Sequence, residues 1–279
     1  MTKEPQKKKN LSEVPRALSR LDEIGKAAFG KDMFVALDFD GTLAPINNDP
    51  KAVEISAEMK KRLKNLAMRC RVSILTGRDI LDIKERVGLE ELFYSGSHGF
   101  EISGPHESGI FFEAGSEYLP ALDRAEESLR VSIGNIPGAV VDRKKFSISV
   151  HYRLVGEDLV PTLKNSVWDV ARSIKGLRAR PDKKAIEILP GMKWNKGSAL
   201  LWLLKATGMS PENSFTISMG DDVTDEDTFR AIKGRGAGII VTETEPPRST
   251  FADYRLQSTA EAGRFIEILE RIAGNTSQK

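Results

Sequence analysis

The stretch LDFDGTLAPI (residues 37–46) sets two aspartates one position apart at the end of an apolar run. The run itself, MFVALDF (33–39), is typical of a buried strand. Alternate side chains of a strand point the same way, so Asp38 and Asp40 can face one site while Phe39 packs behind them. Open parallel sheets bind ligands at the carboxyl ends of their strands. The stretch therefore predicts a functional site, although a turn with two solvated acids remains open on these residues alone.

The residues around this strand end favour a phosphate and a divalent cation. Gly41 permits a sharp turn and the close approach of a phosphate to the backbone, and Thr42 adds a hydroxyl donor. Two adjacent carboxylates repel each other, so keeping both ionised favours a bound divalent cation.

Two later segments place phosphate-binding groups at predicted helix starts. ILTGRD (74–79) ends a predicted strand with Thr76 and Gly77 and then opens a helix, whose free N–H groups suit an anionic oxygen. A threonine or aspartate before a helix is more often only a cap. WNKGSALL (194–201) places Lys196 at a helix start, where a positive charge opposes the helix dipole and a functional reason is worth seeking. A lone surface lysine is the ordinary alternative.

The segment MGDDVTDEDTF (219–229) carries four aspartates and one glutamate directly after an apolar strand. Capping of the following helix explains Asp225 and its neighbours but not Asp221 and Asp222. Together with the acids of residues 38 and 40, they would form an oxygen-rich cluster. Such a cluster suits Mg²⁺ rather than zinc, since no cysteine or histidine accompanies it.

Short apolar strands alternate with amphipathic helices on both sides of a different middle section. The flanking pattern predicts a parallel sheet covered on both faces, with strands at 33–39, 72–76, 92–96, 214–220 and 237–241. In the middle, KFSISVHYR (145–153) alternates apolar and polar residues, which predicts a strand with one open polar face. Further strands are expected there at 109–113, 138–142 and 185–189, with helices near 118–134 and 158–174. We therefore expect a Rossmann-like α/β core (31–99 and 192–279), an inserted α/β domain (100–191) and an N-terminal arm or helix (1–30).

The composition is that of a globular protein with no general affinity for nucleic acid. Of its 279 residues, 40% are apolar and 29% charged, and the net charge is +2. No stretch reaches the roughly 18 to 20 apolar residues of a membrane span, and the polar opening MTKEPQKKKN lacks the apolar core of a secretory signal. Cys70 is the single cysteine, so no intramolecular disulfide is expected, which fits a reducing cytoplasm. We expect a cytoplasmic protein that binds neither nucleic acid nor membranes.

The four motifs, in their order along the chain, resemble the haloacid dehalogenase (HAD) superfamily of phosphotransferases. The resemblance implies a HAD core with a cap domain and Mg²⁺ as cofactor. It implies that Asp38 is the nucleophile and that Asp40 first protonates the leaving oxygen and then deprotonates the water. The cation would be held by the carboxylates of Asp38 and Asp221 and the backbone carbonyl of Asp40, with Asp225 behind them and the place of Asp222 open. The remaining implied phosphate-site and substrate residues are Thr76, Lys196, Gly41, Thr42, Gly77 and Arg78.

Five stretches are more specifically similar to trehalose-6-phosphate phosphatases: LDFDGTLAPI, SGSHG (95–99), RKKFSISVHYR (143–153), KKAIEILPGMKWNKG (183–197) and GDDVTDED (220–227). This resemblance covers residues from about 33 to 270. It implies hydrolysis of trehalose 6-phosphate to trehalose and phosphate, and association with a trehalose-6-phosphate synthase. Candidate sugar-binding side chains are His98, Arg143, His151, Arg153, Lys183, Lys184 and Glu187.

Some of these candidates carry open alternatives. Lys183 shares strand parity with Glu187 and Lys184 does not, so the residues leave open which lysine reaches the sugar. For Arg153, a polar sheet face that simply meets water is an equal alternative.

Other functions also remain open at this point. One is another capped sugar phosphatase, acting for example on sucrose phosphate or mannosyl-phosphoglycerate. Another is a catalytically silent binding or regulatory module, and a third is a receiver-type phosphoprotein. The presence of Asp38, Asp40, Lys196 and Asp221 together favours an enzyme.

Overall fold

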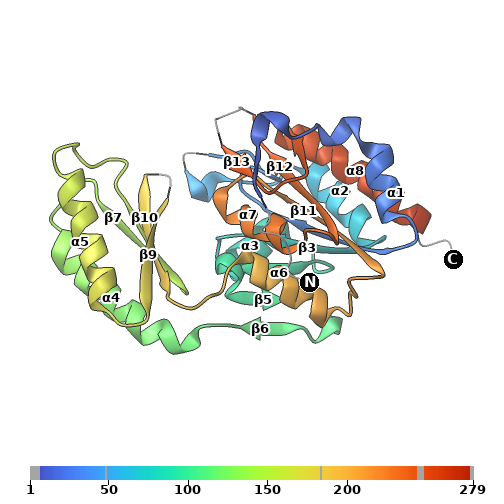
Figure 1. Cartoon of the computed structure of the whole chain (residues 1–279). Helices are drawn as coiled ribbons and strands as arrows, with labels where there is room; N and C mark the ends of the chain where they lie inside the picture. The colour runs from blue at the N-terminus through green and yellow to red at the C-terminus, as the bar shows by residue number, and fades with distance from the viewer. Residues whose placement is uncertain (1–6, 48, 183, 244–247, 277–279) are drawn as a thin grey trace. The chain divides into compact units, whose positions relative to one another are not determined.

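The protein divides into two compact units in a computed structural model that describes residues 7–47, 49–182, 184–243 and 248–276 (Figure 1). The core unit comprises Met1–Phe112 and Trp194–Lys279, and the insert comprises Glu113–Lys193. The two chain segments of the core unit are therefore far apart in sequence and fold as one body.

The core unit is built on an eight-stranded sheet. Its strands, in spatial order, are β14 (Tyr254–Leu256), β12 (Gly236–Val241), β11 (Ser214–Gly220), β2 (Asp32–Leu37), β3 (Arg71–Leu75), β4 (Phe93–Gly96), β5 (Glu101–Ser103) and β6 (Phe111–Glu113). All neighbouring pairs from β14 to β4 are parallel, whereas β4 and β5 pair antiparallel. The predicted Rossmann-like parallel core is confirmed.

Helices cover both faces of this sheet because its central strands are apolar on both sides. Met33, Val35 and Leu37 of β2 pack in one cluster with residues of four helices, whereas Phe34 and Ala36 pack in another with α6. The helices of the first cluster are α1 (Leu21–Ala28), α2 (Ala57–Ala67), α3 (Ile80–Val87) and α8 (Thr259–Thr276). On the other face lie α6 (Lys196–Ala206) and α7 (Glu226–Ala231).

The described residues before β2, from 7 onward, belong to the core unit and do not form a separate arm. Strand β1 (Lys9–Asn10) pairs antiparallel with β13 (Ser249–Thr250). Leu11 is buried against Phe229 of α7 and Ile240 of β12. Burial of apolar surface therefore holds this segment to the sheet.

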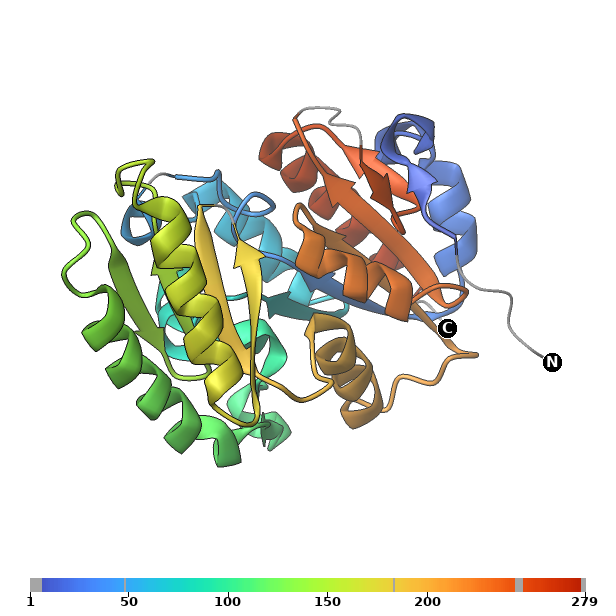
Figure 2. The same ribbon diagram turned by 60° about the vertical axis from the view of Figure 1, so that its left-hand side comes forward.

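The insert is a four-stranded antiparallel sheet with two helices packed along one face. The sheet order is β7 (Val140–Lys144), β8 (Ser147–His151), β10 (Ala185–Pro190) and β9 (Leu177–Asp182). Figure 2 shows α4 (Leu119–Ile133) and α5 (Val160–Ser173) side by side along this sheet. They bury Ile148, Val150, Ile186 and Ile188 in one cluster. The alternation in residues 146–153 correctly predicted which side chains face the helices, but the polar face is not open, because Ser147 and Ser149 are also buried.

The insert begins later than the sequence pattern suggested. Residues from 100 onward were expected in the insert, but β5 and β6 join the eight-stranded sheet, and the compact insert starts at Glu113 and ends at Lys193. The reason is local: the tight turn at 97–99 reverses the chain, so that β5 pairs with β4, with Tyr94 opposite Ser103. The strand expected at 109–113 is therefore a core strand.

Short 3₁₀ turns connect several of these elements. They are η1 (Leu11–Glu13), η2 (Ala17–Ser19), η3 (Pro50–Ala52), η4 (Ser97–Gly99), η5 (His106–Ser108), η6 (Ser116–Tyr118) and η7 (Val223–Asp225). Within the described parts of the chain, no helix has both the length and the apolar character needed to cross a membrane.

Candidate active site

The carboxyl ends of β2 and β11 bring acidic residues from distant parts of the chain together. These strands are parallel neighbours, with Leu37 opposite Met219. The N–H of Asp38 donates to the carbonyl of Met219 at 2.9 Å, which extends the ladder one residue beyond β2. Asp221 follows directly after Gly220, the last residue of β11. Strand pairing thus sets the first aspartate motif beside the second.

Lys196 lies buried between two aspartates. Its Nζ donates to Oδ1 of Asp38 at 2.7 Å and to Oδ1 of Asp225 at 2.8 Å. The side chains of Lys196, Asp38 and Asp225 are 3%, 7% and 2% exposed. Asn195 caps α6 by accepting from the N–H of Ser198 at 2.9 Å, which places Lys196 in the first position of the helix. The lysine expected at a helix start therefore faces the strand ends.

Burial and charge act in opposite directions on these groups. Burial raises the pKa of Asp38 well above its ordinary value, and the charges of Asp225 and Asp221 add to this, although Lys196 opposes it. Burial alone would lower the pKa of Lys196, but its two carboxylate partners outweigh burial and raise it. The ammonium group is therefore retained at neutral pH, and further positive charge beside Asp38 would favour its ionised form.

A carboxylate oxygen from each of Asp38, Asp221 and Asp225 lies within 4.8 Å of the others. The donor set is entirely oxygen, which fits Mg²⁺. A Cβ at residue 41 would lie 2.5 Å from Oδ2 of Asp221, and Gly41 has a φ of +81°. Only glycine allows the first motif to turn directly beneath this carboxylate.

Asp225 and Asp222 hold the acidic loop by reciprocal capping. Oδ2 of Asp225 accepts from the N–H of Asp222 at 3.0 Å, and the side chain of Asp222 accepts from the N–H of Asp225. Both oxygens of Asp225 are thus engaged, one by Lys196 and one by this cap. Asp222 lies outside the group of three acids. These contacts indicate that Asp222 and Asp225 hold the acidic loop in place, which favours a supporting role for both residues over direct binding of a cation.

The Thr76 and His98 segments are interlocked. The N–H of His98 donates to the carbonyl of Thr76 at 2.9 Å, and a Cβ on Gly77 would lie 2.6 Å from the imidazole ring. Thr76 is 1% exposed, and its hydroxyl accepts from the N–H of Arg78 at 3.2 Å. The hydroxyl of Thr42 is buried and has no partner among the described residues. It is available to a ligand oxygen.

Arg78 holds both oxygens of Asp40. Its Nε and Nη2 donate to Oδ2 and Oδ1 of Asp40, each at 2.7 Å, and its Nη1 reaches Oδ2 of Asp82 at 3.1 Å. Asp82 is bound in turn by Arg86, which also donates to the carbonyl of Val53 at 2.6 Å. The bidentate contact fixes the orientation of Asp40.

In the insert, Glu187 is 3% exposed and pairs with Arg180 across the β9–β10 ladder. Nε and Nη2 of Arg180 donate to Oε2 of Glu187 at 2.9 and 2.5 Å. Register places Ser149 opposite Glu187 and His151 opposite Ala185, so His151 and Glu187 share the sheet face away from α4 and α5. Lys144 lies opposite Ser147 and shares it too. This polar face therefore carries both acidic and basic groups.

Three predicted sugar-binding residues do not join this arrangement. Arg143 lies opposite Ile148, on the helix-covered face, and pairs with Asp123 of α4 at 3.0 Å. Arg153 lies beyond β8 and is exposed. Lys184 is an exposed turn residue with a φ of +55°, and Lys183 lies outside the described residues.

Sequence reasoning missed two polar residues of the insert, Arg180 and Lys144. Arg180 belongs to β9, a strand that was not predicted, because Pro181 interrupts its pattern. A signal was present, since an arginine at even spacing from Arg178 is typical of one strand face. Lys144 was missed because the strand was expected to end at 142.

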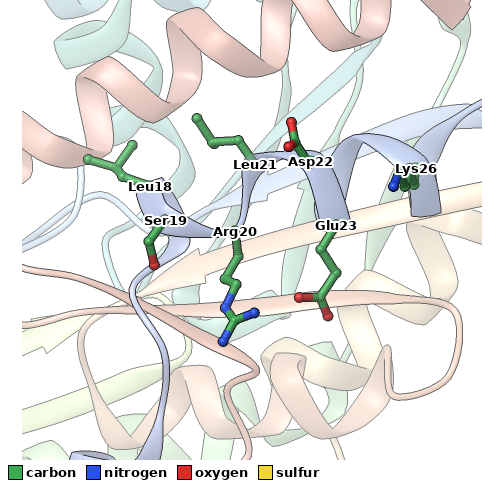
Figure 3. A pocket seen from close by; sticks show the side chains of 7 residues that line it. All are labelled: Leu18, Ser19, Arg20, Leu21, Asp22, Glu23 and Lys26. Atoms are coloured by element: carbon green, nitrogen blue, oxygen red, sulfur yellow. The ribbon is translucent and has the colours of Figure 1, made fainter.

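A groove elsewhere on the core unit contains none of the predicted site residues. It lies along η2 and the start of α1, between Leu18 and Lys26, with a volume of about 610 Å³. Figure 3 shows Arg20 and Glu23 projecting to the same side of this segment. It is a separate surface feature.

Comparisons with known proteins agree with this geometry. The family model described as trehalose-phosphatase matches residues 36–260. The chain is 37% identical over 264 residues to trehalose-phosphate phosphatase B of Arabidopsis thaliana, covering 91% of this chain and 71% of that protein.

Solved structures show the same fold. A trehalose-6-phosphate phosphatase related protein has a TM-score of 0.72 at 26% identity, covering 86% of this chain and 97% of that one. A haloacid dehalogenase-like hydrolase from Bacteroides thetaiotaomicron has a TM-score of 0.62 at 19% identity, covering 87% and 100% of the two chains, and supports the HAD fold alone. Its motifs come together at the carboxyl ends of the core strands. This chain is a phosphatase that belongs to the trehalose-phosphatase family.

Proposed function

We propose that this phosphatase hydrolyses trehalose 6-phosphate to trehalose and inorganic phosphate, with Mg²⁺ as cofactor and an aspartyl phosphate as intermediate. The observation that carries the chemistry is the buried contact of Lys196 with Asp38, beside Asp221. The substrate is supported by the names of the relatives, which are trehalose-phosphate phosphatases.

Asp38, Asp221 and the backbone carbonyl of Asp40 would hold the cation. The all-oxygen set of carboxylates within 4.8 Å supports this assignment. When bound, the cation would neutralise charge on Asp38 and on the phosphoryl oxygens. Asp225 would contribute from behind, through the bonds that it makes to Lys196 and to the N–H of Asp222.

Asp38 is the proposed nucleophile. One of its carboxylate oxygens would attack phosphorus, and the bond from phosphorus to the sugar oxygen would break. That oxygen would take a proton from Asp40 in its protonated form, after release from Arg78. A water molecule then attacks phosphorus, gives its proton to Asp40, and frees the Asp38 carboxylate as phosphate leaves. Lys196 and the hydroxyls of Thr42 and Thr76 would bind phosphoryl oxygens, since phosphoryl transfer depends mainly on positioning and charge neutralisation.

Arg78 would control when Asp40 is available. Both oxygens of Asp40 accept hydrogen bonds from Arg78, so at least one bond must break before Asp40 can reach a sugar oxygen. Phosphate is a strong partner for a guanidinium group. A bound substrate phosphate could therefore draw Arg78 away from Asp40.

The polar face of the insert would recognise the sugar. Glu187 and Arg180 offer an acceptor and a donor on a rigid strand pair, and His151 and Lys144 lie on the same face. The hydroxyl of Ser147 is buried without a partner among the described residues. Hydroxyl-rich ligands need such a convergent set of donors and acceptors. Arg143 is left out of this proposal because it pairs with α4.

The cytoplasmic location and an association with a trehalose-6-phosphate synthase remain proposals. The single cysteine supports the first. Burial raises the pKa of the Cys70 thiol to about 12, so it is not a reactive thiolate at neutral pH. The partner rests on the family resemblance.

Phosphate release from trehalose 6-phosphate, sucrose 6-phosphate, glucose 6-phosphate and p-nitrophenyl phosphate tests the proposal, with Mg²⁺ and with EDTA. Trehalose 6-phosphate should be preferred, and Asp38→Asn should lower its turnover on the order of 10⁴-fold or more. Asp32→Asn, at the opposite, exposed end of the same strand, is the matched control.

The other outcomes identify the alternatives. Preference for another sugar phosphate would keep the mechanism and reject the assignment of the insert. No Mg²⁺-dependent activity on any of the four would indicate a silent binding module. Stable accumulation of the phosphorylated protein would indicate a receiver-type function.

A further inference from the structure

One arginine side chain binds the backbone of both aspartates that follow β11. Nη1 of Arg248 donates to the carbonyl of Asp221 at 3.0 Å, and Nη2 donates to the carbonyl of Asp222 at 3.3 Å. The planar guanidinium group has several donors in a fixed geometry, so it can hold two carbonyls at once. Arg248 therefore braces the acidic loop from the side of its backbone.

The charge of this arginine is balanced locally. Nη2 of Arg248 also donates to Oε1 of Glu226 at 3.1 Å, and Glu226 is 5% exposed. Oε2 of the same glutamate accepts from the N–H of Phe251 at 2.7 Å. Because Glu226 neutralises it, the guanidinium can hold the loop with little repulsion of a nearby cation.

The N-terminal segment fixes the backbone of Arg248. The N–H of Leu11 donates to the carbonyl of Arg248 at 3.0 Å, and β1 pairs with β13 directly after it, with Asn10 opposite Ser249. Leu11 is fully buried. Leu11 therefore holds the backbone of Arg248, and Glu226 holds its side chain.

We propose that Arg248 is a positioning residue for the cation site, because it holds the loop so that the Asp221 carboxylate stays beside Asp38 and above Gly41. This inference rests on the proposed cation at Asp38 and Asp221. The loop has little freedom on that side, since the Asp221 carboxylate occupies the space that a Cβ of residue 41 would take. A small shift of the loop would therefore move one cation ligand away from the others.

The charge of Arg248 and its positioning role predict opposite changes in cation affinity when Arg248 is removed. As a positive charge bound to the loop that carries Asp221, Arg248 would weaken cation binding, and its loss would strengthen it. As a brace it supports a ligand, and residues that orient metal ligands typically change affinity by about 10- to 100-fold. The sign of the change separates the two effects.

The experiment is a titration of the full chain with Mn²⁺, with free Mn²⁺ counted by electron paramagnetic resonance. In Arg248→Gln, the Kd for Mn²⁺ should rise by about 10-fold or more. The matched control is Arg230→Gln, which removes a half-exposed arginine of α7 that pairs with Asp227 and should change Kd less than about 2-fold. The half-saturating Mg²⁺ concentration for phosphate release should rise in parallel, with kcat at saturating Mg²⁺ nearly unchanged.

Arg248→Lys covers the case in which the glutamine variant does not fold. It keeps the charge and a partner for Glu226 but loses the planar guanidinium group that donates to two carbonyls. A Kd for Arg248→Lys that lies between those of the wild type and Arg248→Gln supports positioning. If Arg248→Gln is unfolded, a Kd for Arg248→Lys above that of the wild type supports it. Unchanged or tighter binding in the folded variants would overturn the inference. No binding by the wild type would overturn the proposed cation site itself.

Discussion

The core unit and the insert both gather charged residues beside a sheet, but they hold them differently. In the core, Lys196 of α6 binds both Asp38 and Asp225 at the carboxyl ends of parallel strands, and these side chains are at most 7% exposed. In the insert, Glu187 and Arg180 face each other across antiparallel strands, and Arg180 is 27% exposed. The topology of a parallel sheet concentrates groups at one edge, whereas an antiparallel sheet spreads them over a face. We expect the first to serve a reaction and the second to serve selection.

The largest effect should come from removing the lysine of the core. Lys196→Met leaves Asp38 and Asp225 buried without their cation partner, which should lower the free energy of unfolding by about 3 kcal/mol. Phosphoryl transfer should slow by about 10²- to 10³-fold with sugar and aryl substrates alike. Urea unfolding and phosphate release measure the two effects.

Lys205→Met, at an exposed position near the end of the same helix, is the control and should change neither quantity measurably. If turnover by Lys196→Met stays within tenfold of wild type, the buried charged group of the core does not serve the reaction as the comparison expects.

A smaller and more selective effect is expected from the insert. Glu187→Gln removes the charge that would accept a hydrogen bond from a sugar hydroxyl. Loss of one charged hydrogen bond to the substrate corresponds to about 10- to 100-fold in kcat/KM for trehalose 6-phosphate. Hydrolysis of p-nitrophenyl phosphate, which has no sugar, should stay within about 2-fold of wild type. Steady-state kinetics with both substrates gives the ratio.

The exposed Glu157→Gln in the same unit is the matched control. An equal loss with both substrates would show that the insert takes part in the reaction in general, and the division between reaction and selection would fail.

The smallest effect should come from a core residue whose polar group lies away from the strand-end acids. The hydroxyl of Tyr94 donates to the carbonyl of Leu89 at 2.6 Å, so Tyr94→Phe should cost about 1 kcal/mol of unfolding free energy at pH 8. Burial raises the pKa of Tyr94 to about 12, so the folded state favours the neutral phenol. This contribution is complete below about pH 10 and is lost as the pH rises toward 12.

Urea unfolding of both proteins at pH 8, 10 and 11 checks the sign, since the difference between them should shrink with rising pH. Turnover at pH 8 should be unchanged. A loss of turnover would mean that membership of the core, and not position at the strand ends, decides which residues affect the reaction.

Much of the core could be predicted from sequence because strand order and strand ends determine it. Once β2 and β11 are placed as neighbouring parallel strands, their carboxyl ends lie side by side, which brings Asp38 near Asp221. The bidentate contact of Arg78 with Asp40 could not be predicted, because it depends on side-chain conformations at two different loops.

The sheet face on which each side chain of the insert lies was less predictable, because it depends on the length of the turn between the strands. The two residues between β7 and β8 place Lys144 opposite Ser147 and so turn Arg143 toward the helices. A one-residue shift in the pairing register would have reversed this assignment. Similarly, the start of the insert was misplaced because the three-residue strands β5 and β6 are too short to show a period.

Because the insert interrupts the core unit in sequence, it also affects the order in which the two units fold during synthesis. The insert is one continuous segment with its own apolar cluster, whereas β2 has β11, made much later, as a direct sheet neighbour. Domains generally fold as units while the chain emerges from the ribosome at about 5–20 residues per second. A nascent chain that ends between Lys193 and Asp225 contains Asp38 and a complete insert but cannot contain the assembled group of acids. The reaction site is therefore among the last parts of the molecule to form.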